Sequence, residues 1–264
     1  MGHSCTIFEQ RPQLGGMLRY GIPDYRLPPE ILDRDISHIL WTGIDVHTGI
    51  SIGKDVGIEN IQKDYDAVYI AIGAHSDKKL RIEGEDAKNV ISAVSLLRGI
   101  GENIIPDFTD KRFCVIGGGN VAADCAFTAA ANGAAQVEMF VRRRLADMRI
   151  SQLEYLELLK REIDIMSMSS PEKIEKTADG YSLYIRKNRL TDGHWQPLAN
   201  STVELPGFSL IVTAIGSRAD PKVNDERIIY AGDCKHGGST IVEALASGRD
   251  AARLMESRLV MAAE

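Results

Sequence analysis

The chain has 264 residues, of which 44% are hydrophobic and 26% are charged, as is ordinary for one large globular domain or two small ones. The formal net charge of −6 argues against nucleic-acid binding. No apolar run approaches the roughly 20 residues that a membrane span needs, and no signal peptide is visible. We therefore expect neither a nucleic acid nor a membrane as a partner.

The cysteines are widely separated in the sequence: they are Cys5, Cys114, Cys125 and Cys234. None forms a C-x-x-C or another close pair, so we expect no metal site, no iron–sulfur cluster and no redox-active disulfide. Isolated cysteines of this kind suit a reducing cytoplasm.

The chain begins with a predicted strand at 4–9 that ends in an acidic residue. The next segment, 14–28, is too rich in Gly and Pro for regular structure, although loops rich in Gly, Tyr and Arg often line ligand sites. Apolar residues at helical spacing behind a proline predict a helix at 29–40. Two further strands are predicted at 45–52 and 67–72.

The most informative stretch begins at the short β-prone run 113–116. Gly117, Gly119 and Ala122 follow in the spacing G-x-G-x-x-A and lead into an Ala-rich helix at 122–131. Strand, glycine turn and helix form the context that the dinucleotide-binding motif requires. The first glycine permits a tight turn, the second lets the backbone approach a pyrophosphate, and the small Ala122 lets the helix pack closely on the strand.

The next predicted strand, 135–141, ends in Arg142, Arg143 and Arg144. The motif expects a ribose-reading residue about 20 residues after its glycines, at the end of this strand. A basic residue there favours the 2′-phosphate of NADP over the free ribose hydroxyl of NAD. The alternative is a solvated basic strand end without a ligand.

The rest of the chain predicts a helix at 92–99, an amphipathic helix at 150–161, a β-meander at 174–204 with turns at Asp179-Gly180 and Asp192-Gly193, strands at 210–214 and 228–233, and a helix at 241–260. In the amphipathic helix, Leu153, Leu156, Leu158 and Leu159 are expected to face inward. The glycine-rich turn 237–240 leads into the last helix, which is typical of an anion or polar-ligand site.

Several short motifs stand together: Phe8-Glu9, Gly15-Gly-Met-Leu-Arg-Tyr-Gly-Ile-Pro23, Ala71-Ile-Gly73, Gly117-Gly-Gly-Asn120, Arg142-Arg143, Ala214-Ile-Gly216, Ala231-Gly-Asp233 and Val242-Glu-Ala-Leu245. This set resembles the glutamate synthase small (beta) subunit family of flavoproteins with two dinucleotide-binding domains. The resemblance spans nearly the whole chain, and the block 15–23 is its most specific part.

The resemblance implies an α/β fold with two Rossmann-like domains of the three-layer ββα type. An NAD(P)-binding domain at 75–216 would be inserted in an FAD-binding domain made of 1–74 and 217–264. In that family NADPH gives a hydride to FAD, and electrons leave through iron–sulfur clusters to a partner. The cofactors supply the redox chemistry, so no catalytic acid or base is expected.

The resemblance also implies the cofactor-binding residues. For NADP they are Gly117, Gly119, Asn120 and Val121 at the pyrophosphate, with Arg142 and Arg143 at the 2′-phosphate. For FAD they are Glu9 at the adenosine ribose, Gly16 and Leu18 near the flavin, Ile52 at the adenine, Gly73 beside the phosphates, Gly216 and Gly232 in the glycine turns, Asp233 at the ribityl–phosphate region, and Thr240 and Ile241 at the flavin edge.

Two features of the family are absent from this sequence: the first FAD-binding strand with its G-x-G-x-x-G turn, and the cysteine-rich iron–sulfur segment. Loss of that strand leaves neighbouring backbone groups unpaired, at about 1–3 kcal/mol for each buried group. We expect an N-terminally shortened version of a longer protein, from a fragment, a misassigned start at Met1 or a split gene. On its own it is predicted to bind FAD weakly or not at all, while the NADP domain stays folded.

Three readings remain open. The chain is a flavin- and NADPH-dependent oxidoreductase or part of one, which passes electrons to a partner protein or subunit that carries iron–sulfur clusters. Alternatively, it is a nucleotide-binding or partner-binding module that does not catalyse. In the third reading, another chain or a strand exchanged in a homodimer completes the enzyme, because an open sheet edge invites pairing.

Overall fold

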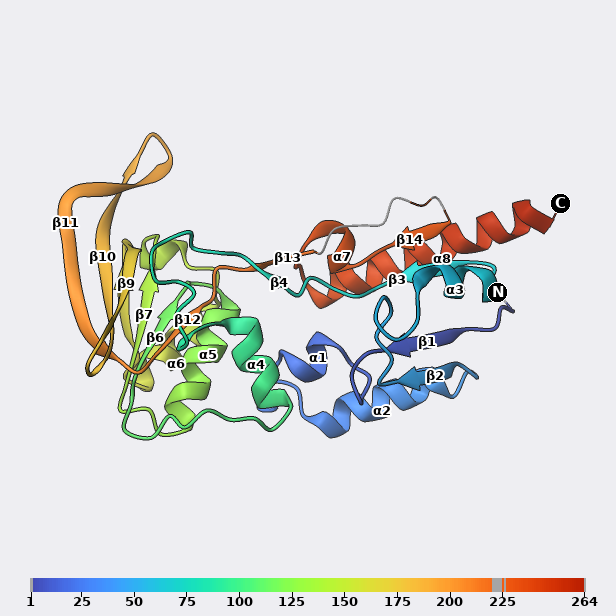
Figure 1. Cartoon of the computed structure of the whole chain (residues 1–264), viewed down its shortest axis with the longest axis horizontal. Helices are drawn as coiled ribbons and strands as arrows, with labels where there is room; N and C mark the ends of the chain where they lie inside the picture. Colours follow the sequence, from blue (N-terminus) through green and yellow to red (C-terminus); the bar gives the residue numbers. More distant parts are fainter. Residues whose placement is uncertain (1, 220–224, 226, 264) are drawn as a thin grey trace. The chain divides into compact units, whose positions relative to one another are not determined.

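The structure, a computed structural model, describes residues 2–219, 225 and 227–263. Two compact units make up the chain (Figure 1). Unit 1 joins Met1–Ser76 to Ser217–Glu264, and unit 2 is the continuous segment Asp77–Gly216. The sequence of unit 2 is thus inserted in that of unit 1.

Unit 2 is built on a five-stranded parallel sheet with the order β5-β12-β6-β7-β8. The strands are β5 (Val90–Ser92), β12 (Leu210–Thr213), β6 (Arg112–Ile116), β7 (Gln136–Val141) and β8 (Asp164–Ser167). In the central strand β6, the apolar residues from Phe113 to Ile116 are all buried. Burial of consecutive residues is expected where both faces of a parallel sheet are covered.

Different layers cover the two faces of this sheet, because successive side chains of a strand point to opposite sides. Phe113 and Val115 of β6 pack in one cluster with residues of the helices, including Leu96 and Leu158. The helices are α4 (Ala93–Gly101), α5 (Asn120–Ala131) and α6 (Gln152–Lys160), with the 3-10 turn η1 (Leu145–Asp147) before α6. Cys114 packs on the opposite face, with side chains of an antiparallel sheet. The predicted α/β class and the ββα layering are confirmed here.

The antiparallel sheet has the order β11-β10-β9. Its strands are β9 (Ser169–Thr177), β10 (Gly180–Thr191) and β11 (His194–Phe208), so the predicted meander is confirmed and is longer than expected at both ends. Asp192 and Gly193 join β10 to β11, with φ values of 50° and 76°. Positive φ at both central residues is the geometry of the two-residue hairpin turn that this dipeptide favours.

Unit 1 contains two separate pairs of parallel strands. One pairs β1 (Thr6–Glu9) with β2 (Asp45–Thr48), and the other pairs β14 (Ile228–Tyr230) with β3 (Val68–Ile70). Its helices are α1 (Met17–Tyr20), α2 (Pro29–Leu40), α3 (Ile58–Asp64), α7 (Asp233–His236) and α8 (Ile241–Ala263). The two-residue strands β4 (Ser76–Asp77) and β13 (Ser217–Arg218) pair with each other.

The prediction that segment 14–28 lacks regular structure was wrong for one turn of helix. Four helix-tolerant residues, Met17 to Tyr20, stand between Gly16 and Gly21, and the amide of Gly21 donates to the Met17 carbonyl at 3.0 Å. The buried side chain of Tyr20 anchors this turn. The local composition did not predict this helix because a glycine flanks it on each side.

The predicted inward face of the helix 150–161 is confirmed for Leu158 and was wrong for the other three leucines. In α6 only Leu158 is fully buried, whereas Leu153, Leu156 and Leu159 are 79%, 52% and 49% exposed. Helical positions rotate by about 100° per residue, so the residues beside Leu158 on the buried face are those three and four positions earlier. The other three leucines therefore lie outside that face.

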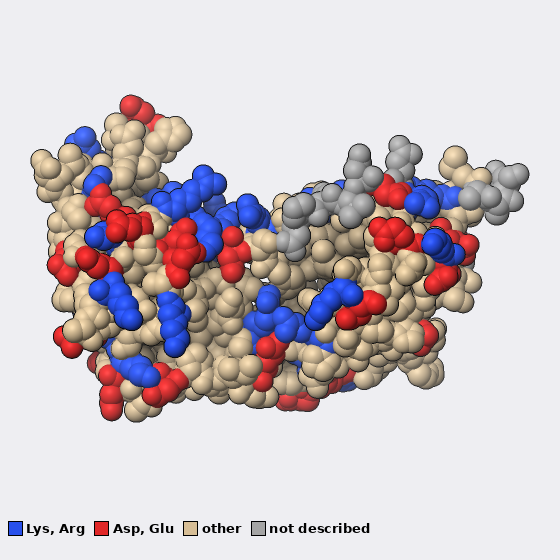
Figure 2. Space-filling view, in the orientation of Figure 1, with Lys and Arg blue, Asp and Glu red and all other residues tan. Residues whose placement is uncertain are grey.

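The surface carries a mixture of charges. Small groups of acidic and basic side chains are interspersed over the face drawn in Figure 2. Among the helices that the structure describes, none has the length and apolar character that a membrane crossing requires.

Candidate functional site

The turn after β6 brings the predicted phosphate-binding glycines to the start of α5. Gly117 has a φ of +156°, and a Cβ there would lie 2.4 Å from the carbonyl oxygen of Ala214. Gly119 is the N-cap of α5, and an added Cβ there would meet nothing within 4 Å. The backbone at Gly119 is thus open to a close-approaching group.

The N-terminus of α5 has the properties of an anion site. Asn120 and Val121 form its first turn, and both side chains are exposed. The amide of Val121 donates no hydrogen bond to any residue that the structure describes. Unsatisfied amides and the helix dipole together favour a negatively charged group at this position.

Small residues hold α5 close to the sheet. Ala122, Ala123, Ala126 and Ala129 are fully buried. A Cβ on Gly118 would lie only 2.7 Å from Val141 Cγ1, so the turn also lies directly against the end of β7. This packing fixes the direction in which the helix N-terminus points.

The structure brings the predicted arginines to the same edge of the sheet. β6 and β7 are parallel neighbours, and the amide of Gly117 donates to the Phe140 carbonyl at 3.0 Å. Arg142 and Arg143 follow directly after β7; the first is exposed and the second is half-buried. Neither guanidinium forms an ion pair with a carboxylate of the described residues, whereas Arg144 pairs with Asp147 at 2.8 Å. Two arginines without an ion pair among the described residues therefore follow the strand that neighbours the glycine turn.

A third arginine at this edge was not predicted. The amide of Arg149 donates to the Gly118 carbonyl at 2.9 Å, and Arg149 forms an isolated parallel bridge with Gly119. Its side chain is exposed. Nothing in the local sequence marks Arg149, because the contact joins a loop to the glycine turn through a long-range backbone hydrogen bond.

In unit 1 the predicted residues of the N-terminal segment lie at strand ends and turns. Glu9 ends β1, and its Oε1 accepts a hydrogen bond from the Arg11 amide at 2.8 Å. Gly16 precedes α1 with a φ of 51° and open space where a Cβ would be, and Leu18 is half-buried within α1. Ile52 is 38% exposed and bridges Val56.

The remaining predicted glycines each adopt a positive φ. Gly73 after β3 has a φ of 74°, Gly216 after β12 has 99°, and Gly232 after β14 has 65°. The Gly216 carbonyl accepts from the Lys78 amide at 3.1 Å, and the Gly232 amide donates to Ser247 Oγ at 2.8 Å. A Cβ at Gly232 would meet nothing within 4 Å.

Side chains of Thr240 and Glu243 cap the N-terminus of α8. Thr240 Oγ1 accepts from the Glu243 amide at 3.2 Å, and Glu243 Oε2 accepts from the Thr240 amide at 3.0 Å, which is a reciprocal cap. The backbone hydrogen bond from Thr240 lowers the pKa of the Glu243 carboxyl. Asp233 Oδ1 accepts from the Ser239 hydroxyl at 2.9 Å, and Ile241 is 50% exposed.

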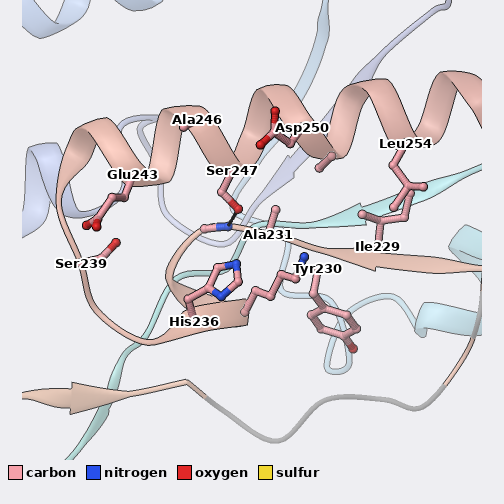
Figure 3. A pocket seen from close by; sticks show the side chains of 13 residues that line it. Ile229, Tyr230, Ala231, His236, Ser239, Glu243, Ala246, Ser247, Asp250 and Leu254 are labelled. Atoms are coloured by element: carbon pink, nitrogen blue, oxygen red, sulfur yellow. Dashed lines mark hydrogen bonds between the residues drawn. The ribbon is translucent and has the colours of Figure 1, made fainter.

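A pocket of about 660 Å³ lies beside this helix within unit 1 (Figure 3). Residues from β14, α7 and α8 line it, including Gly232, His236, Glu243, Ser247 and Asp250. Its lining combines the carboxylates of Glu243 and Asp250 on α8 with the amine of Lys235 and the imidazole of His236 on α7. The two carboxylates disfavour a phosphate group there.

The residues present fit NADP and fit FAD only in part. Unit 2 offers an open glycine backbone, a helix N-terminus and two available arginines. Unit 1 offers open glycines at Gly16 and Gly232 and an acid at Glu9. However, β1 and β14 each have a single hydrogen-bonded strand neighbour among the described residues, and no described strand with a phosphate-binding glycine turn lies on their second edge.

Comparisons with known proteins place the chain among NAD(P)-dependent oxidoreductases. It is 33% identical to the NADP(+)-dependent formate dehydrogenase subunit beta of Moorella thermoacetica, over 95% of this chain and 40% of that protein. It is 27% identical to the glutamate synthase [NADPH] small chain of Escherichia coli, over 95% of this chain and 62% of that protein. The chain therefore spans less than two thirds of the length of these relatives.

The fold matches solved structures as well. Mycobacterium tuberculosis FprA in complex with NADPH superposes with a TM-score of 0.85 at 19% identity, over 98% of this chain and 78% of that one. The family model for pyridine nucleotide-disulphide oxidoreductases matches residues 6–238. These matches confirm the predicted resemblance, the oxidoreductase class and the pairing of FAD with NADP as the cofactors of the family. The chain belongs to the pyridine nucleotide-disulphide oxidoreductase family.

Proposed function

We propose that this chain is the NADPH-binding part of a flavoprotein oxidoreductase that passes electrons to a partner. The supporting observation is the edge of the unit 2 sheet, where the open backbone of Gly119 lies in the turn that packs on the end of β7, directly before Arg142 and Arg143. When both cofactors are bound, NADPH supplies a hydride and FAD accepts it.

The chain's own residues have binding and orienting roles in this proposal. Gly117, Gly119, Asn120 and Val121 hold the pyrophosphate at the N-terminus of α5, through backbone amides and the helix dipole. The two arginines bind the 2′-phosphate by charge-assisted hydrogen bonds, which distinguishes NADP from NAD. No acid or base of the protein is required for hydride transfer.

For FAD we propose a partial site in unit 1. Glu9 would accept from the adenosine ribose, Ile52 would contact the adenine, and Gly73, Gly216 and Gly232 would allow close backbone approach. Gly16 and Leu18 would lie near the flavin, Asp233 near the ribityl chain, and Thr240 and Ile241 at the flavin edge. The dipole of α8 would favour negative charge on the flavin.

The partner is an electron acceptor outside this chain. The names of the two relatives, a beta subunit and a small chain, describe parts of larger assemblies. We propose by analogy a partner protein or subunit with iron–sulfur clusters, with a homodimer as the alternative assembly. The scattered cysteines suit a cytoplasmic location, which we propose on that basis.

A second function, nucleotide binding without catalysis, is favoured by one observation. The strand pairs β1–β2 and β14–β3 are not joined by another strand among the described residues. A chain with this sheet would bind NADP in unit 2 and yet hold no flavin to receive the hydride. Reduction of an artificial electron acceptor by NADPH separates the two functions, because only the oxidoreductase supports it.

Binding titrations of NADPH and NADH test the proposal. Arg142→Ala and Arg143→Ala are each expected to weaken NADPH binding about tenfold and to leave NADH binding unchanged, since only NADPH carries the 2′-phosphate. Lys176→Ala removes an exposed positive charge from β9 of the same unit and serves as the control. The proposed site is contradicted if the control weakens NADPH binding as much as the arginine variants do, or if the arginine variants leave NADPH binding unchanged.

A further inference from the structure

The antiparallel sheet of unit 2 holds the arginine segment that follows β7. Asn188, near the end of β10, is 2% exposed. Its Nδ2 donates to the carbonyl oxygen of Arg142 at 2.9 Å and to Ser170 Oγ at 2.8 Å. A buried amide side chain thus fixes the backbone at Arg142.

The backbone of Arg143 is linked to the same strand, β10, through Met168. The amide of Met168 donates to the Arg143 carbonyl at 2.9 Å, and the amide of Asn188 donates to the Met168 carbonyl at 2.6 Å. Met168 has a φ of 53°, a conformation that a non-glycine residue keeps only where its surroundings impose it. Asn188 is therefore linked to the arginine segment in two ways. Its side chain bonds to Arg142 directly, and its backbone bonds to Met168, which in turn bonds to Arg143.

The third arginine is directed elsewhere by its own partners. Arg144 Nε and Nη2 donate to the two carboxylate oxygens of Asp147, at 2.8 Å and 3.0 Å. Its guanidinium also lies 6.0 Å from the ring centroid of Trp195, at the start of β11. These contacts engage Arg144 in an ion pair, whereas Arg142 and Arg143 form none with a carboxylate of the described residues.

The orientation of the Asn188 amide is determined by its neighbours. Rotation by 180° would place Oδ1 against the Arg142 carbonyl, where two acceptors would repel each other. In the observed orientation, Oδ1 is buried and has no hydrogen-bond partner among the described residues. An apolar residue of similar size would avoid this unmet acceptor, so the contact with the arginine segment explains why an amide stands there.

We propose that Asn188 is a positioning residue for 2′-phosphate recognition: it holds the backbone of Arg142 so that the arginines meet the 2′-phosphate of a dinucleotide whose pyrophosphate lies at the N-terminus of α5. This inference rests on the proposed NADP site. It adds to that site a residue of the antiparallel sheet that orients the arginines. This residue lies about 45 positions after them in the chain. Asn188 itself does not touch the dinucleotide.

The test compares 2′,5′-ADP with 5′-AMP as calorimetric ligands, because they differ only in the 2′-phosphate. Asn188→Leu keeps the branched shape of the side chain and removes both donated hydrogen bonds together with the acceptor that lacks a partner. Asn188→Ala is the second variant. Each is expected to weaken 2′,5′-ADP binding about three- to tenfold and to leave 5′-AMP binding unchanged. Asn89→Ala is the matched control. Asn89 also donates a hydrogen bond through Nδ2 to a backbone carbonyl, that of Ser209 at 2.9 Å, and does not bond to the arginine segment.

The outcomes separate this inference from the proposed function. If the unaltered chain prefers 2′,5′-ADP and both folded Asn188 variants keep that preference, Asn188 has no positioning role and the proposed function stands. Equal weakening of both ligands indicates a general structural role and overturns the inference as well. If the unaltered chain binds neither ligand, the proposed function fails, and this inference fails with it.

Discussion

The carbonyl oxygen of Ala214 faces the Cα of Gly117, so close that a Cβ on Gly117 would lie 2.4 Å from it. The two residues directly follow the neighbouring parallel strands β12 and β6, and the Ala214 amide donates to the Ile116 carbonyl at 2.8 Å. Gly117 is thus required by the fold itself, whereas Gly119, which has open space beside it, is available for a ligand.

Gly117→Ala is expected to destabilise unit 2 by about 1–3 kcal/mol, because the methyl group overlaps a backbone atom and alanine rarely adopts this φ. Urea unfolding followed by circular dichroism measures the change. Gly119→Ala is the matched control and should cost about 1 kcal/mol or less, the usual difference between glycine and alanine at an N-cap. Equal stability of the two variants would contradict the assigned contact.

The same Gly119→Ala variant is expected to bind NADPH about tenfold more weakly while it stays folded. Its methyl group would occupy the space where a pyrophosphate approaches the backbone. Fluorescence titration of NADPH provides the measurement, and the thermal midpoint of unfolding verifies the fold. Unchanged affinity in the folded variant would show that no phosphate approaches Gly119.

An ion pair between adjacent strands predicts a second effect on stability. Arg112 of β6 donates through Nε and Nη2 to the two carboxylate oxygens of Glu138 on β7, at 2.9 Å and 3.0 Å, and its guanidinium lies 4.3 Å from the ring centroid of Phe208. Glu138 is only 7% exposed. Arg112→Ala should therefore cost about 2–4 kcal/mol in urea unfolding, because it leaves a nearly buried carboxylate without its partner.

The double variant Arg112→Met with Glu138→Leu is the control for this pair. Replacing both charges with apolar side chains of similar size removes the uncompensated carboxylate, so the double variant should be more stable than Arg112→Ala. A double variant that is the less stable of the two would show that the loss comes from Arg112 packing on Phe208 and not from the charge.

The sequence predicted the elements of the candidate site that depend on local constraints. The strand, glycine turn and helix at 113–131 were foreseeable because a tight turn and a close-packed helix each require small residues at fixed positions. The arginines after β7 were foreseeable from their spacing. Arg149 and Asn188 were not, because long-range hydrogen bonds to Gly118 and Arg142 bring them to the site.

Periodicity was less informative where elements are short. In α6, a helix of nine residues, leucines occur on several sides, and only packing in the folded unit selects Leu158 for burial. In α1, four residues suffice for a turn that flanking glycines conceal. Both errors arise because tertiary contacts, rather than local composition, determine which apolar side chains are buried.

Thiol chemistry gives a prediction that involves pH. Burial raises the pKa of the Cys114 and Cys125 thiols, whereas Cys5 is exposed. A raised pKa keeps a thiol protonated and unreactive as the pH increases from 7 to 9. Cys234 is buried as well. A thiol-reactive dye should therefore label Cys5 and leave Cys114, Cys125 and Cys234 unlabelled over this pH range.

Peptide mapping of the labelled native protein provides the measurement for that prediction. Cys5→Ser should remove nearly all native labelling, and unfolding in guanidinium should expose the other cysteines. Rapid labelling of Cys125 in the native protein would contradict its burial within α5.

The last prediction concerns the flavin. Because β1 and β14 each pair with one strand only in the described part of unit 1, the purified chain is expected to show no flavin absorbance and to take up little added FAD. NADPH binding should persist, since its residues all lie in unit 2. A visible spectrum recorded before and after adding FAD, and again after NADPH, measures both properties. A flavin band that NADPH bleaches would contradict the prediction and would mean that unit 1 completes its flavin site, by chain pairing or otherwise, so that this chain performs the oxidoreductase reaction itself.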